Sequence, residues 1–183
     1  MAFARLVLRL VVGGLFAGHG LQKLAGWFGG PGLEKTGGYF ESELHLRPGK
    51  AHAAAAGATE AGCGALIALG LATPAAASGL IAVMLTAIRK VHFEKGVWVT
   101  NGGFEYNAVL IAALAVIVES GPGQLSLDAA FGIEKKGLRW AVLALAAGVI
   151  GSVGAVALGE AGAEDEEPPA ESTQVAAAAA AAA

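Results

Sequence analysis

The sequence predicts an all-α protein: a polytopic transmembrane helix bundle with a four-helix core and a fifth, C-terminal span. Only 15% of the 183 residues are charged and 55% are hydrophobic, whereas a soluble domain carries about 25% charged residues. The apolar runs are dominated by alanine, glycine, leucine and valine, and the chain holds 28 glycines. Small residues of this kind let transmembrane helices approach one another closely. These observations indicate a membrane domain rather than a soluble core.

The first predicted span covers residues 4–24, about the ~20 residues that a helix needs to cross a bilayer. Arg9 interrupts its apolar run, no small-x-small cleavage site follows, and the run continues past Gly20. We therefore expect a retained span rather than a signal peptide. Gly14 and Gly18 lie four residues apart and are expected to receive a neighbouring helix.

Polar residues end the first span and lead into a long connection, residues 25–50. Gln22 and Lys23 are expected to reach the membrane surface with their polar ends, as long amphipathic side chains do. His19 lies deeper. Long connections are often functional. An interfacial cap that binds no ligand is an equally good interpretation of residues 25–50. The aromatic residues of the connection, which suit the headgroup region, are Trp27, Phe28, Tyr39 and Phe40.

The second predicted span, residues 51–72, carries a carboxylate in its middle. Glu60 would cost several kcal/mol at that depth unless it is paired or protonated. Ala58 and Gly62 form a small-xxx-small pair that predicts close packing. The third span runs from Pro74 to about Ile88.

Two further spans complete the predicted bundle. The fourth begins near Phe104 and ends at Glu119, and a Gly-Pro-Gly break follows it. The fifth covers residues 138–158 and is expected to be a packing or lipid-facing helix. Its packing notches are Gly148, Gly151 and Ser152.

These patterns divide the chain into three predicted segments. Residues 1–123 form the four-helix membrane domain with its 25–50 connection, and residues 124–159 supply a second connection and the additional helix. Residues 160–183 are an acidic and Ala-rich tail. The composition of this tail predicts disorder.

Charged and polar residues of several spans are expected to meet at one end of the bundle. Antiparallel spans place the 25–50 and 89–103 connections on the same membrane side, and the opposite half should be almost purely apolar. Ionisable groups inside a bundle pair with one another and mark a pathway or a site. Arg89 is the first candidate partner for Glu60, because a guanidinium matches a carboxylate bidentately. The alternative is a set of structural ion pairs that fix helix register without a ligand. The candidate ligand-binding or proton-handling residues are His19, Glu60, Arg89, Lys90, His92, Glu105, Tyr106 and Asn107.

Several other kinds of site are disfavoured. Cys63 is the single cysteine, so the chain has no Cys-x-x-Cys pair or intramolecular disulfide, and we expect a small buried side chain there. Metal-ligand spacing is missing. A haem would require His19 and His92 to face each other. The few scattered basic residues do not predict nucleic-acid binding.

The sequence resembles the DoxX family of bacterial membrane proteins over about residues 4–120. The resemblance rests on the Gly-His-Gly-Leu-Gln-Lys-Leu ending of the first span (residues 18–24), on Glu60, and on residues 92–107 with their Gly-Gly-Phe-Glu-Tyr-Asn ending. It implies a four-helix core and a location in the bacterial plasma membrane. The distribution of lysine and arginine favours a cytoplasmic N-terminus.

Three functions are compatible with this resemblance. Relatives include a subunit of an archaeal thiosulfate:quinone oxidoreductase and a mycobacterial membrane partner of oxidative-stress enzymes. The first function is therefore an accessory role in membrane redox or oxidative-stress chemistry, with a polar pocket for a quinone or a small anion. The others are a non-catalytic scaffold for soluble partners, and a small-molecule or proton permease. Expected partners are the lipid bilayer and other membrane or soluble redox proteins, in a homo-oligomer or a larger complex. Whether this chain itself catalyses a reaction stays open.

Overall fold

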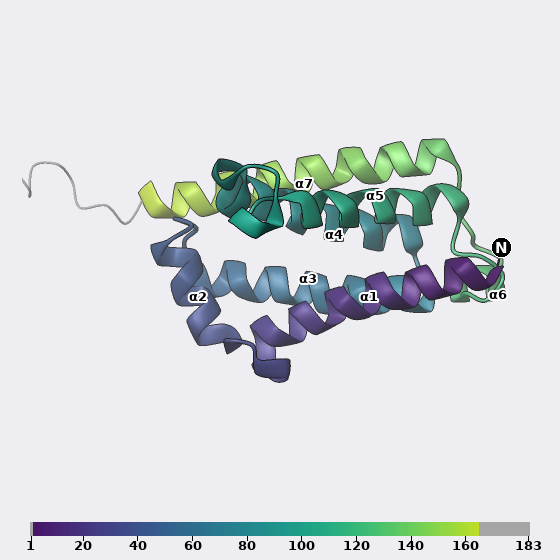
Figure 1. Cartoon of the computed structure of the whole chain (residues 1–183), viewed down its shortest axis with the longest axis horizontal. Coiled ribbons are helices and arrows are strands. Elements are labelled where there is room, and N and C mark those ends of the chain that lie inside the picture. The colour runs from purple at the N-terminus through teal and green to yellow at the C-terminus, as the bar shows by residue number, and fades with distance from the viewer. Residues whose placement is uncertain (1, 165–183) are drawn as a thin grey trace, which may run out of the picture.

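The computed structural model describes residues 2–164, which form helices joined by short connections (Figure 1). The elements in chain order are α1 (Ala2–Ala25), η1 (Trp27–Gly29), α2 (Gly32–Ser42), α3 (Gly49–Leu69), α4 (Thr73–Ala87), η2 (Ile88–His92), η3 (Phe93–Lys95), η4 (Val99–Asn101), α5 (Glu105–Ser120), α6 (Leu127–Ala130) and α7 (Leu138–Glu164). No strand occurs in this part of the chain. The predicted all-α fold is confirmed.

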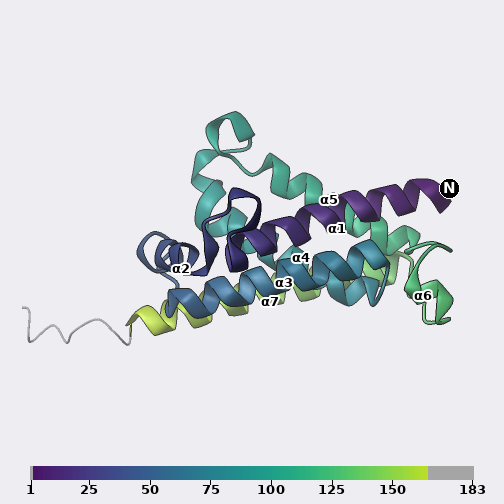
Figure 2. The same cartoon turned by 90° about the horizontal axis from the view of Figure 1, so that it is seen from below.

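The five long helices lie in two layers (Figure 1). Helices α1 and α3 pack together along their lengths, and α7 packs along α4 in the other layer, which also contains α5. The N-terminus and α6 lie at one end of the bundle, which we call the α6 end. The opposite end, the α2 end, holds α2 and the connections of residues 26–48 and 88–104 (Figure 2). Both long predicted connections thus lie at the same end.

Three helices are long and apolar enough to cross a membrane: Ala2–Ala25, Thr73–Lys95 and Leu138–Ala163. All five predicted spans are present as helices, but α3 and α5 do not qualify by these criteria. Helix α5 has 16 residues and a length of about 24 Å at ~1.5 Å per residue, short of the ~30 Å hydrocarbon core. Helix α3 carries Glu60 in its middle. The chain is a helical membrane bundle in which these two helices pack against the longer ones.

Glycine contacts join α1 to α3. A Cβ added to Gly13 would lie 2.5 Å from the Gly64 carbonyl oxygen, and one added to Gly20 would lie 2.3 Å from the Ala61 nitrogen. The predicted contact residues Gly14 and Gly18 have nothing within 4 Å. That prediction was wrong because neighbouring helix positions differ by about 100° in direction, so Gly14 and Gly18 lie on a different face.

The same correction applies to α3. Its contact residues are Gly57 and Gly64, whose added Cβ atoms would lie 2.8 Å from Leu24 Cγ and 2.6 Å from the Ala17 nitrogen. The predicted residues lie on another face: Gly62 has nothing within 4 Å, and Ala58 is exposed. The glycines that touch are therefore seven residues apart on each helix.

Helix α7 packs against α4 through the predicted notches. A Cβ on Gly148 would lie 2.4 Å from Ile81 Cγ2, and one on Gly151 would lie 3.1 Å from Ala82 Cβ. The buried Ser152 hydroxyl lies 3.0 Å from the Thr86 hydroxyl oxygen, within hydrogen-bond distance. Helix α7 continues beyond the predicted end of the span to Glu164. The rest of the predicted tail, residues 165–183, lies outside the described residues.

The α6 end is more polar than predicted. Asp128 is 2% exposed and accepts hydrogen bonds from the backbone of Ala72 (2.8 Å) and Thr73 (3.1 Å) and from the Thr73 hydroxyl (2.8 Å). Arg9 is also buried and donates through Nη2 to the Leu125 carbonyl oxygen at 2.6 Å. Asp128 satisfies backbone donors at the start of α4, which have no partner within the helix itself. The expectation of an almost purely apolar half was therefore wrong.

Candidate functional site

A cavity of about 550 Å³ lies between the two helical layers toward the α2 end. Helices α1, α2, α3, α4, α5 and α7 all contribute side chains to its wall. Most of the lining is apolar, and ionisable groups are few. Its size lies within the range of ~300–1,000 Å³ that is typical of small-molecule sites.

The main charged feature of the cavity is an ion pair between α1 and α3. Lys23 Nζ lies 2.6 Å from Glu60 Oε2, and Glu60 is almost fully buried. Glu60 shares a helix face with Gly57 and Gly64, three residues before it and four after it, because side chains at these spacings lie on one side of a helix. Lys23 stands in the same relation to Gly20. The glycine contacts that bring the two helices together therefore also bring the two charges together.

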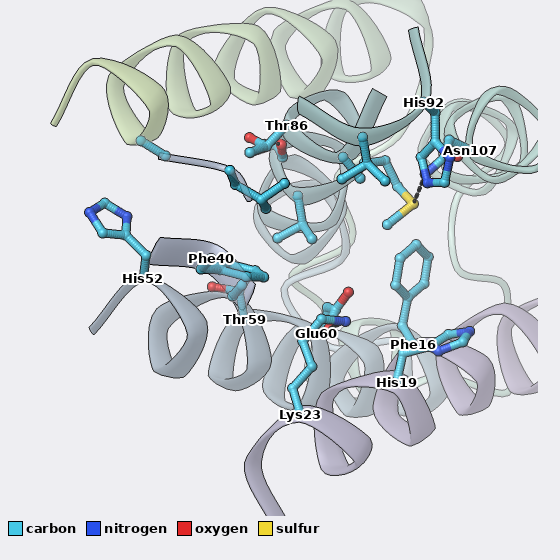
Figure 3. Close-up of a pocket in the computed structure, with 18 of the residues that line it drawn as sticks. Phe16, His19, Lys23, Phe40, His52, Thr59, Glu60, Thr86, His92 and Asn107 are labelled. Carbon is cyan, nitrogen blue, oxygen red and sulfur yellow. Dashed lines mark hydrogen bonds and ion pairs between the residues drawn. The ribbon is translucent and has the colours of Figure 1, made fainter. Parts of the chain in front are cut away.

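Glu60 has one oxygen free of protein partners. Its Oε2 atom accepts from Lys23, while Oε1 takes no hydrogen bond from residues 2–164. Glu60 lines the cavity, and Figure 3 shows its carboxyl group beside the open space. The pair thus offers a ligand both an acceptor, Oε1, and a donor, the Lys23 ammonium.

Two histidines line the cavity in different ways. His92 Nδ1 lies 2.6 Å from the Gly102 carbonyl oxygen, and since a carbonyl can only accept, Nδ1 carries the proton. His19 Nδ1 lies 2.9 Å from Gln22 Oε1, and its side chain is exposed although it lines the cavity. Each ring therefore keeps Nε2 free for another partner among the described residues. His19 is less deeply placed than the sequence predicted.

The α5 side of the cavity is formed by Asn107 and Tyr106. Asn107 is buried at 5% exposure, and its Nδ2 lies 3.4 Å from the sulfur of Met84. Tyr106 is exposed. The buried ring of Phe16 lies between this group and the Lys23–Glu60 pair (Figure 3).

One known protein family matches this chain. The family model DoxX matches residues 4–93. The chain belongs to the DoxX family. No curated protein and no solved structure matches it.

The match to the DoxX family includes α1 and α3, which carry Lys23 and Glu60, and α4 with the following turn η2, which carries His92. It ends before the Gly-Gly-Phe-Glu-Tyr-Asn segment, to which the sequence analysis extended the resemblance. Helices α5 and α7 complete the cavity in this DoxX protein from outside the matched residues.

Three of the predicted site residues lie outside the cavity of the DoxX protein. Arg89 is exposed, and Lys90 pairs instead with Glu160 on α7 at 2.9 Å. Glu105 lies in the first turn of α5 and does not line the cavity. Helix α4 continues here as the π-helical turn η2, and this turn carries His92 to the cavity. The expected Arg89–Glu60 pair was wrong, and the partner of Glu60 is Lys23.

Sequence reasoning missed part of the cavity wall. Lys23 was predicted to reach the membrane surface. A single lysine near the end of the first span and a single carboxylate in the middle of the second could have predicted the Lys23–Glu60 pair. Helix α7 was expected to be a packing or lipid-facing helix, but it also contributes Gly151 and Ala155 to the cavity wall. Other lining residues without a sequence signal for this role include Leu44, Leu46, His52, Thr59 and Thr86.

Among residues 2–164, no three His, Cys, Asp or Glu residues are grouped so that they could hold a metal ion. The chemistry available in the cavity is hydrogen bonding and ion pairing within a mostly apolar enclosure.

Proposed function

We propose that the cavity binds the headgroup of a quinone, and that this DoxX protein is an accessory subunit in membrane redox chemistry. The observation that supports this proposal is the placement of one buried Lys–Glu pair in an otherwise largely apolar cavity. A quinone is a flat apolar ring whose polar atoms are its carbonyl oxygens. The Lys23 ammonium can donate to a carbonyl oxygen, and Glu60 Oε1 can accept from a hydroquinone hydroxyl.

The charge balance of the site favours a quinone over a small anion. Lys23 and Glu60 neutralise each other, so the pair offers no excess positive charge to an anion. The cations Arg89 and Lys90, which were predicted among the candidate site residues, do not line the cavity. A neutral ring with hydrogen-bonding edges fits this environment better.

The accessory role follows from the residues available for electron transfer. Cys63 is the single cysteine of the chain, so its own thiols cannot form an intramolecular dithiol couple. We therefore assign electron delivery to a redox partner protein, and assign to this chain the binding of the quinone in the membrane.

Equilibrium binding of a chainless benzoquinone, and of its hydroquinone, to the purified protein in nanodiscs tests this proposal. The pocket variants are Glu60→Gln and Lys23→Met. Matched controls are Glu34→Gln and Lys50→Met, which alter an exposed Lys–Glu pair between α2 and α3. Hydrogen bonds to charged groups contribute ~1.5–3 kcal/mol, so Lys23→Met should weaken binding of the quinone, and Glu60→Gln should weaken binding of the hydroquinone, by about ten-fold or more.

The control variants Glu34→Gln and Lys50→Met should bind the ligand as tightly as the wild-type protein. Absence of binding to the wild-type protein, or equal binding by wild-type, pocket and control proteins, would overturn the proposal.

A further inference from the structure

The cavity has two chemically different halves. One half, toward α1 and α5, carries the Lys23–Glu60 pair, His92 and Asn107. The other half lies between α3 and α7, where the small residues Ala56, Gly151 and Ala155 line the cavity and no charged pair is present. The polar residues on this side are His52, Thr59 and Thr86, and the Thr86 hydroxyl already donates within α4 to the Ala82 carbonyl oxygen. Figure 3 shows the polar groups of His92 and Asn107 gathered on one side, with Phe40 on the other.

The apolar half exists because α3 and α7 barely touch. Helix α1 packs along α3 and helix α4 along α7, whereas α3 and α7 belong to different layers. Alanine and glycine fill little of the gap between them. A quinone ring held by Lys23 and Glu60 would leave this half of the cavity empty.

The gap also leads to the side of the bundle. Ala55 on α3 and Gly151 on α7 line the cavity, and both are exposed. Helix α7 is the most apolar of the candidate membrane spans, so lipid chains are expected against its outer face. The opposite side of the cavity is bordered instead by the more polar His19 and Tyr106. An apolar chain attached to a bound ring therefore has an outlet between α3 and α7.

We propose that the ligand is a membrane-resident quinone whose apolar chain lies in the gap between α3 and α7, past Ala56 and Ala155. This proposal rests on the headgroup binding proposed above and adds the ligand class and its orientation. The ring faces α1 and α5, and the chain enters the bilayer beside α7.

Contact, rather than affinity, is the measurement that tests this orientation. The chain of a membrane quinone is already surrounded by lipid tails, which are as apolar as leucine, so its transfer into the gap changes affinity little. A quinone that carries a photoreactive diazirine on its chain reports contact directly. The probe is cross-linked to the full chain in lipid vesicles, with and without an excess of the same quinone lacking the diazirine. Adducts are then mapped by mass spectrometry.

The expected result is a set of adducts at residues 53–56 and 151–155 that the excess quinone removes. Ala155→Phe fills the gap and should abolish these adducts while chainless benzoquinone still binds. Ala157→Phe is the matched control, because Ala157 is exposed on the same helix and does not line the cavity. It should leave the adducts unchanged. Ala56→Leu, with Ala58→Leu as its control, repeats the test on the α3 wall.

Two outcomes separate the proposals. If chainless benzoquinone binds but the competed adducts lie on α1 or α5, or if no adduct is competed, the chain orientation is overturned and headgroup binding stands. If chainless benzoquinone does not bind to the wild-type protein, headgroup binding fails and the chain orientation fails with it.

Discussion

Lys23 on α1 and Glu60 on α3 form an ion pair of 2.6 Å, in which the Glu60 side chain is 3% exposed and the Lys23 side chain is 25% exposed. The carboxylate is thus enclosed by the bundle, while the lysine reaches it from the more exposed end of α1. Removing one member of such a pair leaves a buried charge without compensation, which is more damaging than removing both. The pair therefore affects both the stability of the bundle and the chemistry of its cavity.

The first prediction concerns Lys23→Met. This change leaves Glu60 buried without its ammonium partner, and we expect a loss of about 3 kcal/mol, at the lower end of the range for broken buried pairs because Lys23 is partly exposed. Thermal unfolding of the protein in detergent measures it. The double variant Lys23→Met/Glu60→Gln should recover most of the loss, and Lys50→Met in the exposed pair should have little effect. Unfolding of Lys23→Met at the wild-type temperature would show that the pair does not stabilise the bundle.

The second prediction concerns the buried carboxylate at the α6 end. Asp128→Ala removes the acceptor for the backbone N–H groups of Ala72 and Thr73 and for the Thr73 hydroxyl. Stability should fall by about 3 kcal/mol, since the donors at the start of α4 lose a charged partner. Hydrogen exchange should rise first at residues 72–76. Glu134→Ala, an exposed change at the same end, should stay within about 0.5 kcal/mol of the wild-type protein. Equal exchange in both variants would contradict this role of Asp128.

The third prediction separates the two glycine faces of α1. Gly20→Ala places a Cβ 2.3 Å from the Ala61 nitrogen of α3, whereas Gly18→Ala places one where nothing lies within 4 Å. Overpacking should cost Gly20→Ala about 1–3 kcal/mol. Gly18→Ala should be neutral or stabilising by up to ~1 kcal/mol, because alanine is the better helix former. Thermal unfolding of the two variants side by side decides it, and the reverse order would indicate a different α1–α3 register.

The all-α membrane bundle could be predicted from composition because apolar content and small residues identify helices without any knowledge of their contacts. The importance of Glu60 was equally accessible, since a carboxylate in the middle of an apolar helix requires a partner. Which residue supplies that partner depends on the rotation of α1 against α3. Neighbouring residues of a helix point about 100° apart. For this reason Gly13 contacts α3, whereas Gly14 faces away from it.

The remaining errors arise from features that local sequence does not specify. Arg89 was predicted to pair with Glu60 because a guanidinium matches a carboxylate, but it lies on a π-helical turn over residues 88–92 and is exposed. Asp128 gave no signal because its role depends on α6 folding back onto the start of α4. Ala155 became part of the cavity only through the packing of α7 in the layer opposite α3.

The central claim is that the Lys23–Glu60 pair holds a quinone headgroup. Infrared difference spectroscopy tests it directly, with a short-chain benzoquinone that is isotope-labelled at one carbonyl carbon and bound to the purified protein. A hydrogen bond from the Lys23 ammonium lowers the stretching frequency of the carbonyl that it contacts. We predict a downshifted carbonyl band in the wild-type protein and in Lys50→Met, and its loss in Lys23→Met. A band at the same frequency in all three proteins, or at the frequency of the free quinone in the wild-type protein, would contradict the claim.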